Sequence, residues 1–239
     1  MNKNKIILIV VIVSLIAFLG FLFINKSHSN AETNQNNYSN AEGTKTTSQD
    51  NTQINKNEEI KENNKEEGID NMYRKGKHSV NIEIKNYGTI ELELDADVAP
   101  ITVANFAKLV NEGFYNGLTF HRIIDGFMIQ GGDPEGTGMG GSNQNITGEF
   151  ALNGIENNIS HVRGTISMAR ARSYNSASSQ FFIVHEDSTF LDGQYAGFGK
   201  VTKGIEIVDQ ICENIKVEDN NGTVLVENQP IIEKITMID

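Results

Sequence analysis

Residues 6–24 form one uninterrupted apolar run, and this run determines on which side of a membrane the rest of the chain would lie. It reads IILIVVIVSLIAFLGFLFI and carries no charge. As a helix rising about 1.5 Å per residue it would span roughly 28 Å, close to the hydrocarbon thickness of a bilayer. Lys3 and Lys5 precede the run, so the positive-inside rule puts the N-terminus in the cytoplasm. We therefore predict a single-pass anchor in the cell membrane, with the C-terminal part of the chain outside the cytoplasm.

A cleaved signal peptide is the alternative interpretation of the same run. Ser29, Asn30 and Ala31 form a small-x-small sequence at which a signal peptidase could cut, and the protein would then be secreted. The run is longer than the apolar stretch of about 7–15 residues that signal peptides usually have, which favours the uncleaved anchor. A lipid-modified N-terminus is excluded because no cysteine lies near the run.

The composition changes again after the run. Residues 1–25 are the predicted anchor or signal segment. Residues 26–77 are rich in Asn, Ser, Thr, Glu and Lys and hold few large apolar side chains, so they cannot bury enough surface to offset their ordering entropy. We predict a disordered polar linker there. Residues 78–239 carry the strand and helix signals and are long enough to bury a sizeable core, and we predict that they form one folded domain and a monomer.

Charge and cysteine content exclude several functions. The net charge of −11 argues against binding nucleic acid, whose phosphates require a basic face. Cys212 is the one cysteine, which excludes an internal disulfide and a multi-cysteine zinc site. It lies in an apolar helical stripe and is predicted to be a buried small hydrophobe. His121, His161 and His185 are too scattered to form an i,i+4 metal pair, so no metal site is predicted.

Short alternating segments dominate the predicted domain. Alternation of apolar and polar residues at 80–84 and 90–94, joined by a turn, predicts a hairpin with one buried face. A helical pattern begins at Pro100 and ends at Gly113. Further strands are predicted at 119–124, 127–130, 165–169, 180–184, 197–201 and 232–238, with a second helix at 205–213. This pattern favours a mainly β fold, a closed barrel capped by helices at its ends.

Residues 120–133, FHRIIDGFMIQGGD, carry the strongest chemical signal. Strict strand alternation predicts Phe120, Arg122 and Ile124 on one face of a strand. An arginine among apolar neighbours is ordinarily a surface residue or half of an ion pair. Here it is followed by two large apolar side chains and an amide, Phe127, Met128 and Gln130. An apolar surface with one fixed cation and one amide is typical of a pocket for a largely uncharged ligand.

Three other motifs follow in order: SMARA at 167–171, SQFFI at 179–183 and LDGQYAGFGKV at 191–201. Each motif alone fits barrel core with turn glycines. Together with residues 120–133 they resemble the cyclophilin family of peptidyl-prolyl cis-trans isomerases, most closely its compact bacterial members. The similarity extends from about Val80 to Ile238. The resemblance implies a mainly β fold, a closed eight-stranded antiparallel β-barrel capped by two α-helices, with a hydrophobic groove outside the barrel and no cofactor.

The resemblance also implies site residues. Arg122 matches the catalytic arginine. The implied substrate-binding positions are Phe127, Met128, Gln130, Ala169, Arg170, Ala171, Gln180, Phe182, Phe190, Leu191 and Tyr195. Within this set, the large apolar side chains would hold the proline ring, and the two glutamines would contact the substrate backbone or the arginine. The main chain of Arg170 would hold the residue before proline.

The chain departs from the family pattern at three positions. Tyr195 stands where many relatives have His, and Phe190 stands where the drug-sensitive eukaryotic members have Trp. Asp125 replaces the proline usual before Gly-Phe-Met. The first two changes keep an aromatic contact, so activity should survive. The missing indole N–H at Phe190 implies that cyclosporin binds weakly.

The residue types themselves, apart from the family resemblance, are suited to catalysing the isomerisation of X–Pro bonds. Rotation about an X–Pro amide meets a barrier of roughly 18–20 kcal/mol because resonance ties up the nitrogen lone pair. No bond breaks, so an apolar surface for the ring and one donor aimed at the nitrogen suffice. The predicted function is peptidyl-prolyl cis-trans isomerisation in proline-containing polypeptides that fold after export. The alternative is a tethered, non-catalytic module that binds proline peptides or acts as a chaperone.

Two enzyme classes are disfavoured by the motifs that the chain contains. Residues 136–141 match GxGxxG, but no amphipathic helix follows, so a dinucleotide site is not predicted. Ser, His and Asp are all present without a Gly-x-Ser-x-Gly elbow, so a hydrolase of that type is not predicted either.

Overall fold

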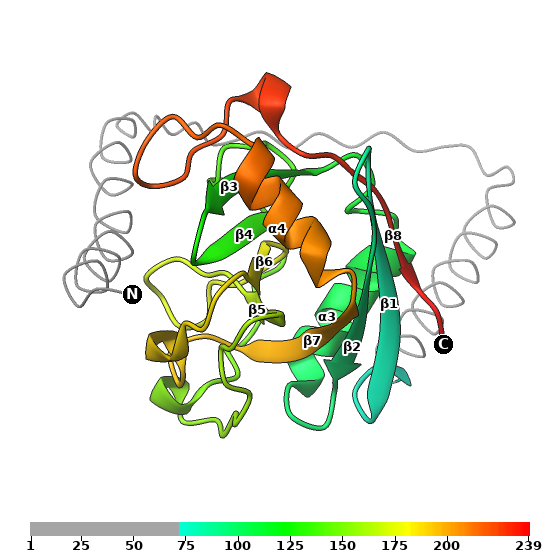
Figure 1. Cartoon of the computed structure of the whole chain (residues 1–239). Coiled ribbons are helices and arrows are strands. Elements are labelled where there is room, and N and C mark those ends of the chain that lie inside the picture. The colour runs from blue at the N-terminus through cyan, green and yellow to red at the C-terminus, as the bar shows by residue number, and fades with distance from the viewer. Residues whose placement is uncertain (1–71) are drawn as a thin grey trace, which may run out of the picture. The chain divides into compact units, whose positions relative to one another are not determined.

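The computed structural model describes residues 72–239, which are coloured in Figure 1. The predicted anchor at 6–24 and almost all of the predicted linker lie outside the described residues. Within residues 72–239, no helix is both long and apolar enough to cross a membrane. The predicted folded domain, residues 78–239, falls entirely within the described part.

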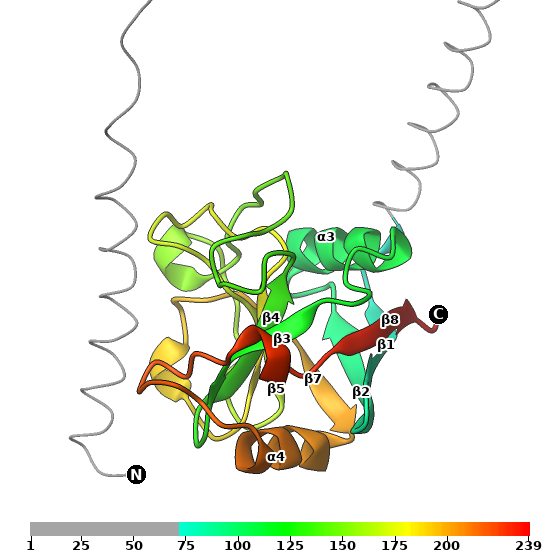
Figure 2. The ribbon, with the colours of Figure 1, turned by 90° about the horizontal axis from the view of Figure 1, so that it is seen from above.

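The described residues form eight strands and two α-helices. The strands are β1 (Lys77–Ile84), β2 (Gly88–Asp95), β3 (Thr119–Ile124), β4 (Met128–Asp133), β5 (Thr165–Met168), β6 (Phe181–Val184), β7 (Gly197–Lys203) and β8 (Ile232–Met237). The helices are α3 (Pro100–Asn111) and α4 (Ile205–Asn214), with 3-10 turns η1 (Ala151–Asn153), η2 (Thr189–Leu191) and η3 (Val226–Asn228). Figure 2 shows α3 and α4 at opposite ends of the strands. The predicted fold class is confirmed, and each predicted strand and helix is present within a few residues of its expected bounds.

The eight strands form one antiparallel sheet that curls so that its two edges meet. Its order is β3-β4-β6-β5-β7-β2-β1-β8. A short seam joins the edge strands: the Phe120 amide donates to the Pro230 carbonyl at 3.0 Å, and the Ile232 amide donates to the Leu118 carbonyl at 2.8 Å. The seam closes the sheet around one core, which leaves the other face of each strand available for a site on the outside.

The first hairpin follows directly from its alternating sequence. Val80 pairs with Leu92 and Ile82 pairs with Ile90, and all four side chains are buried. Asn86 in the connecting turn has φ of 68°, a left-handed conformation that asparagine tolerates better than most residues. The alternation of apolar and polar residues in the sequence therefore gives the hairpin one buried face, as predicted.

Aromatic rings fill the centre of the barrel. Phe106 of α3 lies with its ring centroid 5.1 Å from Tyr115, 5.6 Å from Phe181 and 5.3 Å from Phe198. All four side chains are fully buried, and Phe106 meets Phe181 edge to face, a favoured geometry for aromatic pairs. Tyr73 is also buried, so the packed structure extends to residues before β1.

Cys212 lies on α4 and is buried, as predicted for a small hydrophobe. Burial raises the pKa of its thiol to about 12, and the carboxylates of Asp125 and Asp209 add to this shift. The thiol is therefore protonated at neutral pH and is a poor nucleophile.

The sequence analysis predicted that side chains alternate strictly between the two faces of β3, and this prediction is wrong. The register with β4 shifts between Phe120, which pairs with Gly131, and Arg122, which pairs with Gln130. This irregularity leaves Phe120 and Ile123 in the barrel core, while Arg122 turns away from it. Phe120 and Arg122 therefore do not share a face, because a β-bulge adds a residue and re-aims the side chains that follow it.

Candidate active site

A second group of buried apolar side chains lies outside the barrel core. Phe127, Met128, Phe182 and Leu191 are each at most 5% exposed, yet none belongs to the core cluster. Met128 and Phe182 lie on the neighbouring strands β4 and β6, on the face opposite to core residues such as Ile129. We call these four side chains the outer apolar cluster. The sequence had suggested all four as parts of one pocket: Met128 and Phe182 share the outer face, Phe127 directly precedes β4, and Leu191 lies on η2.

Arg122 is fixed beside this cluster by hydrogen bonds at two of its three guanidinium nitrogens. Its Nη1 donates to Gln130 Oε1 at 3.1 Å and lies 4.0 Å from Met128 Sδ, and its Nε donates to the Asn221 carbonyl at 2.8 Å. Its buried Nη2 has no hydrogen-bond partner among the described residues. Burial lowers the pKa of Arg122 to about 10, so the side chain remains a cation at neutral pH. The site therefore presents an uncommitted, charged donor next to apolar side chains.

A chain of two glutamine amides holds the arginine in place. Gln130 accepts from Arg122, and its Nε2 donates to Gln180 Oε1 at 2.8 Å. Gln180 Nε2 donates in turn to the carbonyls of Gly138 and Gly140, at 3.1 and 2.7 Å. The hydrogen-bond partners fix the orientation of both side-chain amides. One continuous chain of hydrogen bonds therefore connects the loop around 138–140 with the Arg122 guanidinium.

Asn221 is a neighbour of Arg122 that the sequence analysis missed. Its carbonyl receives the Arg122 Nε–H, and the next residue, Gly222, accepts from the Ile123 amide at 2.8 Å. A Cβ on Gly222 would lie 2.2 Å from the Ile123 carbonyl oxygen, and its φ of +81° is left-handed, so only glycine fits there. Asp219 closes the loop by accepting from the Asn221 and Thr223 amides. The Asp-Asn-Asn-Gly turn sequence could have revealed the loop, but not its contact with β3.

Another missed residue is His161, which lies beneath the outer apolar cluster. Its ring stacks on Phe182 with centroids 6.0 Å apart, its Nδ1 lies 2.8 Å from Asp192 Oδ1, and its Nε2 lies 2.9 Å from Ser167 Oγ. Burial lowers the pKa of His161 although Asp192 opposes the shift. Ser, His and Asp here resemble a hydrolase triad, but Ser167 and His161 are fully buried. A neutral, hydrogen-bonded His161 therefore acts as a rigid support for the Phe182 ring.

The remaining predicted positions surround the cluster. Phe190 of η2 is half-buried and lies with its ring 5.7 Å from that of Phe127. The Tyr195 ring meets Phe182 edge-on at 5.9 Å, and the Arg170 guanidinium lies 4.7 Å from the Tyr195 centroid.

The main chain of residues 169–171 runs along the same side. The Ala169 amide donates to the Gln180 carbonyl at 2.9 Å. Ala171 is exposed, and its carbonyl accepts from the Arg170 guanidinium at 3.0 Å. Hydrogen bonds from Arg170 to the Gln194 carbonyl tie this segment to the loop that carries Tyr195. Hydrogen bonds and ring contacts thus link five of the predicted residues to Arg122 or Phe182: Gln130, Gln180, Ala169, Arg170 and Tyr195.

His121, next to Arg122, is buried without either ring nitrogen having a hydrogen-bond partner among residues 72–239. Burial lowers its pKa to about 4; Asp133 opposes this shift and Arg122 reinforces it. The ring is therefore neutral at physiological pH, and an imidazolium beside the guanidinium would be costly.

Comparison with known proteins gives consistent matches to the same region. The profile of the family described as "Cyclophilin type peptidyl-prolyl cis-trans isomerase/CLD" matches residues 79–237. Peptidyl-prolyl cis-trans isomerase A of Dickeya dadantii is 46% identical over 150 residues, 61% of this chain and 76% of its own. Peptidyl-prolyl cis-trans isomerase B of Bacillus subtilis is 48% identical over 138 residues, 58% of this chain and 87% of its own.

Solved structures give the same match in three dimensions. A cyclophilin-type peptidyl-prolyl cis-trans isomerase of Cryptosporidium parvum aligns with a TM-score of 0.61 at 33% identity, over 69% of this chain and 99% of its own. Its structure in the presence of the dipeptide Ala-Pro aligns with a TM-score of 0.59 at 34% identity, over 67% and 99%.

We predict that replacing His121 reduces the acid sensitivity of the fold. The unfolded chain takes up a proton on His121 near pH 6.5, whereas the folded chain resists it down to about pH 4, so wild type loses stability as the pH falls through this window. His121→Leu should lose stability less steeply, by up to about 1.4 kcal/mol per pH unit. Urea unfolding at several pH values between 7 and about 4, followed by circular dichroism, measures this slope.

His121→Gln is the matched control, because it also cannot titrate but keeps a polar side chain. Both variants should show the same shallower slope. A wild-type slope in both variants would contradict the prediction.

Proposed function

This chain belongs to the family of cyclophilin-type peptidyl-prolyl cis-trans isomerases, and we propose that Arg122 and the outer apolar cluster perform this isomerisation on X–Pro bonds of polypeptide substrates. The observation that carries the proposal is the Arg122 Nη2 donor, which is buried, charged and without a partner in the described part of the chain. It adjoins a set of apolar side chains large enough to pack against a pyrrolidine ring.

The mechanism uses differential binding of the twisted amide. The proline ring packs on the outer apolar cluster, and the preceding residue is held by the main chain near Arg170. As the amide twists, its nitrogen loses resonance and becomes pyramidal and basic. Arg122 Nη2 can then donate to it, which it cannot do to the planar ground state. Because no bond breaks, no proton or nucleophile needs to move.

Arg122→Ala is expected to lower turnover at saturating substrate at least tenfold while the peptide still binds. Loss of a charge-assisted hydrogen bond of about 1.5–3 kcal/mol gives this minimum, since each 1.36 kcal/mol is about tenfold. Arg122→Lys should recover only part of the rate, because an ammonium lacks the planar fork that Gln130 and Asn221 orient. Exchange spectroscopy on an Ala-Pro peptide reports turnover and affinity together.

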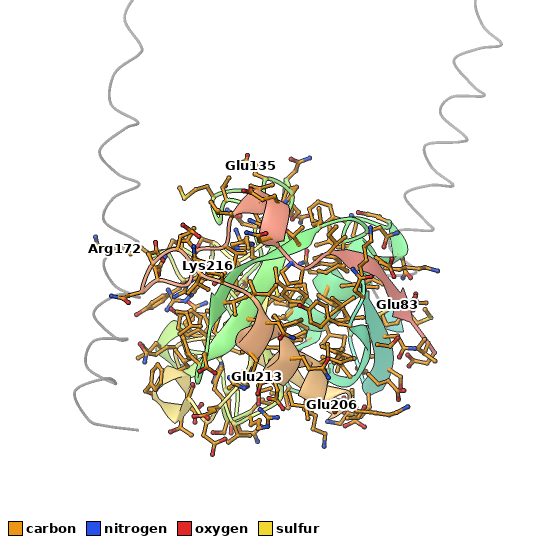
Figure 3. The ribbon with its side chains drawn as sticks, turned by 45° about the horizontal axis from the view of Figure 1, so that its top comes forward. Glu83, Glu135, Arg172, Glu206, Glu213 and Lys216 are labelled. Carbon is orange, nitrogen blue, oxygen red and sulfur yellow. The ribbon has the colours of Figure 1, made fainter. Side chains whose placement is uncertain are left out.

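Arg172→Ala is the matched control for that experiment. Arg172 is exposed and is labelled on the outside of the domain in Figure 3. Its removal should leave turnover unchanged. If Arg122→Ala instead binds peptide much more weakly but turns over normally at saturation, Arg122 is a binding residue. Wild type that binds peptide without accelerating exchange would favour the alternative, a non-catalytic binding or chaperone module.

We propose weak cyclosporin binding, improved by Phe190→Trp. Phe190 lies beside Phe127 in the outer part of the site, and phenylalanine lacks the N–H donor of an indole. One added hydrogen bond of about 0.5–1.5 kcal/mol corresponds to roughly twofold to tenfold tighter inhibition. Inhibition titrations of wild type and mutant measure the change. Equal potency would mean that the residue 190 side chain does not meet the ligand.

We also propose that residues 6–24 anchor the chain in the cell membrane and leave a monomeric domain outside the cytoplasm, where its clients fold after export. The support is the uncharged run of 19 residues and the lysines before it. Intact-mass measurement of the protein from the membrane fraction should find the original N-terminus. A mature N-terminus near Glu32 would instead indicate cleavage and a secreted protein.

A further inference from the structure

Three potential metal ligands that are far apart in the sequence meet beside α4. Asp125 lies in the turn between β3 and β4, His185 directly follows β6, and Cys212 lies on α4. One ligand atom from each side chain lies within 4.8 Å of the other two. Their residue types are also mixed: a carboxylate, an imidazole and a thiol. Spacing along the sequence could not reveal this cluster, because it is assembled by three separate elements.

His185 is oriented as metal-binding histidines usually are. Its Nε2 lies 3.0 Å from Asp209 Oδ1, and Asp209 is itself held by Arg163 Nη2 at 2.8 Å. With the proton on Nε2, the lone pair of Nδ1 faces the cluster, where it lies 3.5 Å from Asp125 Oδ1. A carboxylate behind the imidazole fixes its tautomer, which is the common outer arrangement around metal-bound histidines.

We propose that Cys212 Sγ, His185 Nδ1 and the Asp125 carboxylate bind a divalent cation of the zinc type, with water as a fourth ligand. Zinc accepts sulfur, nitrogen and oxygen ligands in a tetrahedron, whereas magnesium and calcium prefer oxygen alone. The thiol proton passes to solvent as the thiolate binds the metal. The three proposed ligands do not include Arg122 or any residue of the outer apolar cluster.

The cluster needs only a local adjustment to close around a cation. Bonds of about 2.0–2.3 Å place neighbouring ligand atoms about 3.3–3.8 Å apart, so the set must contract by about 1 Å. The Asp125 side chain is 80% exposed and can rotate to make this change. The Gly126 amide now donates to His185 Nδ1 at 2.9 Å, and the cation would take its place. Gly126 lies in a partly exposed turn, so its N–H can donate a hydrogen bond to water once the cation has replaced it at His185.

Cobalt(II) titration of the full-length chain tests the proposal directly. Because Cys212 is the one cysteine of the chain, a thiolate-to-cobalt charge-transfer band in the near ultraviolet can arise from no other residue. We expect this band together with intense visible bands typical of tetrahedral cobalt, saturating at one cobalt per chain. Zinc should displace the cobalt and abolish both. Absence of the thiolate band would overturn the proposal, as would saturation at one cobalt per two chains.

Variants identify the three ligands. Cys212→Ser should abolish the thiolate band, and Asp125→Ala and His185→Gln should each weaken cobalt binding at least tenfold. Asp125 is exposed, so its replacement leaves the fold intact even if the His185 variant proves unstable. Glu83→Gln, an exposed carboxylate on β1 labelled in Figure 3, is the control and should bind as wild type does. Wild-type affinity in Asp125→Ala would overturn the proposed ligand set.

Discussion

A cation set among apolar side chains must be held by hydrogen bonds, and the arrangement around Arg122 meets this constraint. Removing a guanidinium from water is costly unless its donors find acceptors. Gln130 on β4 and the Asn221 carbonyl supply two of them. The remaining nitrogen, Nη2, has no hydrogen-bond partner among the described residues. The loop after α4, the strand β4 and the chain of amides through Gln180 therefore together fix the guanidinium and leave this one nitrogen unpaired.

Local patterns in the sequence predicted most of the fold. The hairpin of β1 and β2 and the helix from Pro100 follow from periodicities that act over a few residues, and both are present. The bulge in β3 was not predicted, because it depends on how β3 pairs with β4 rather than on β3 itself. Its consequence is large, since it separates Phe120 in the core from Arg122 at the site. Register is a property of two strands, and a single-strand pattern does not contain it.

The candidate site also contains residues that the sequence could suggest and residues that only the structure reveals. Arg122 and the outer apolar cluster could be suggested from the sequence because the motifs that carry the resemblance include them. Residues that hold those residues were missed: His161 contacts Phe182 through ring stacking, and Asn221 contacts Arg122 through its backbone. A backbone carbonyl leaves no signature in the side-chain sequence. The cluster of Asp125, His185 and Cys212 is also invisible to spacing rules, because only the closed barrel brings a turn, a strand end and a helix together.

The pairing of the first strand with the last sets the order in which this domain can form. β1 lies between β2 and β8, and the Ile238 amide donates to the Ser79 carbonyl at 2.9 Å. A chain emerging from its N-terminus therefore exposes an unpaired edge of β1 until β8 has been synthesised. Contacts of such long sequence separation slow folding, because a large loop must close before they form. The sheet is consequently complete only after β8 has been synthesised, and until then the open edge of β1 could pair with another chain.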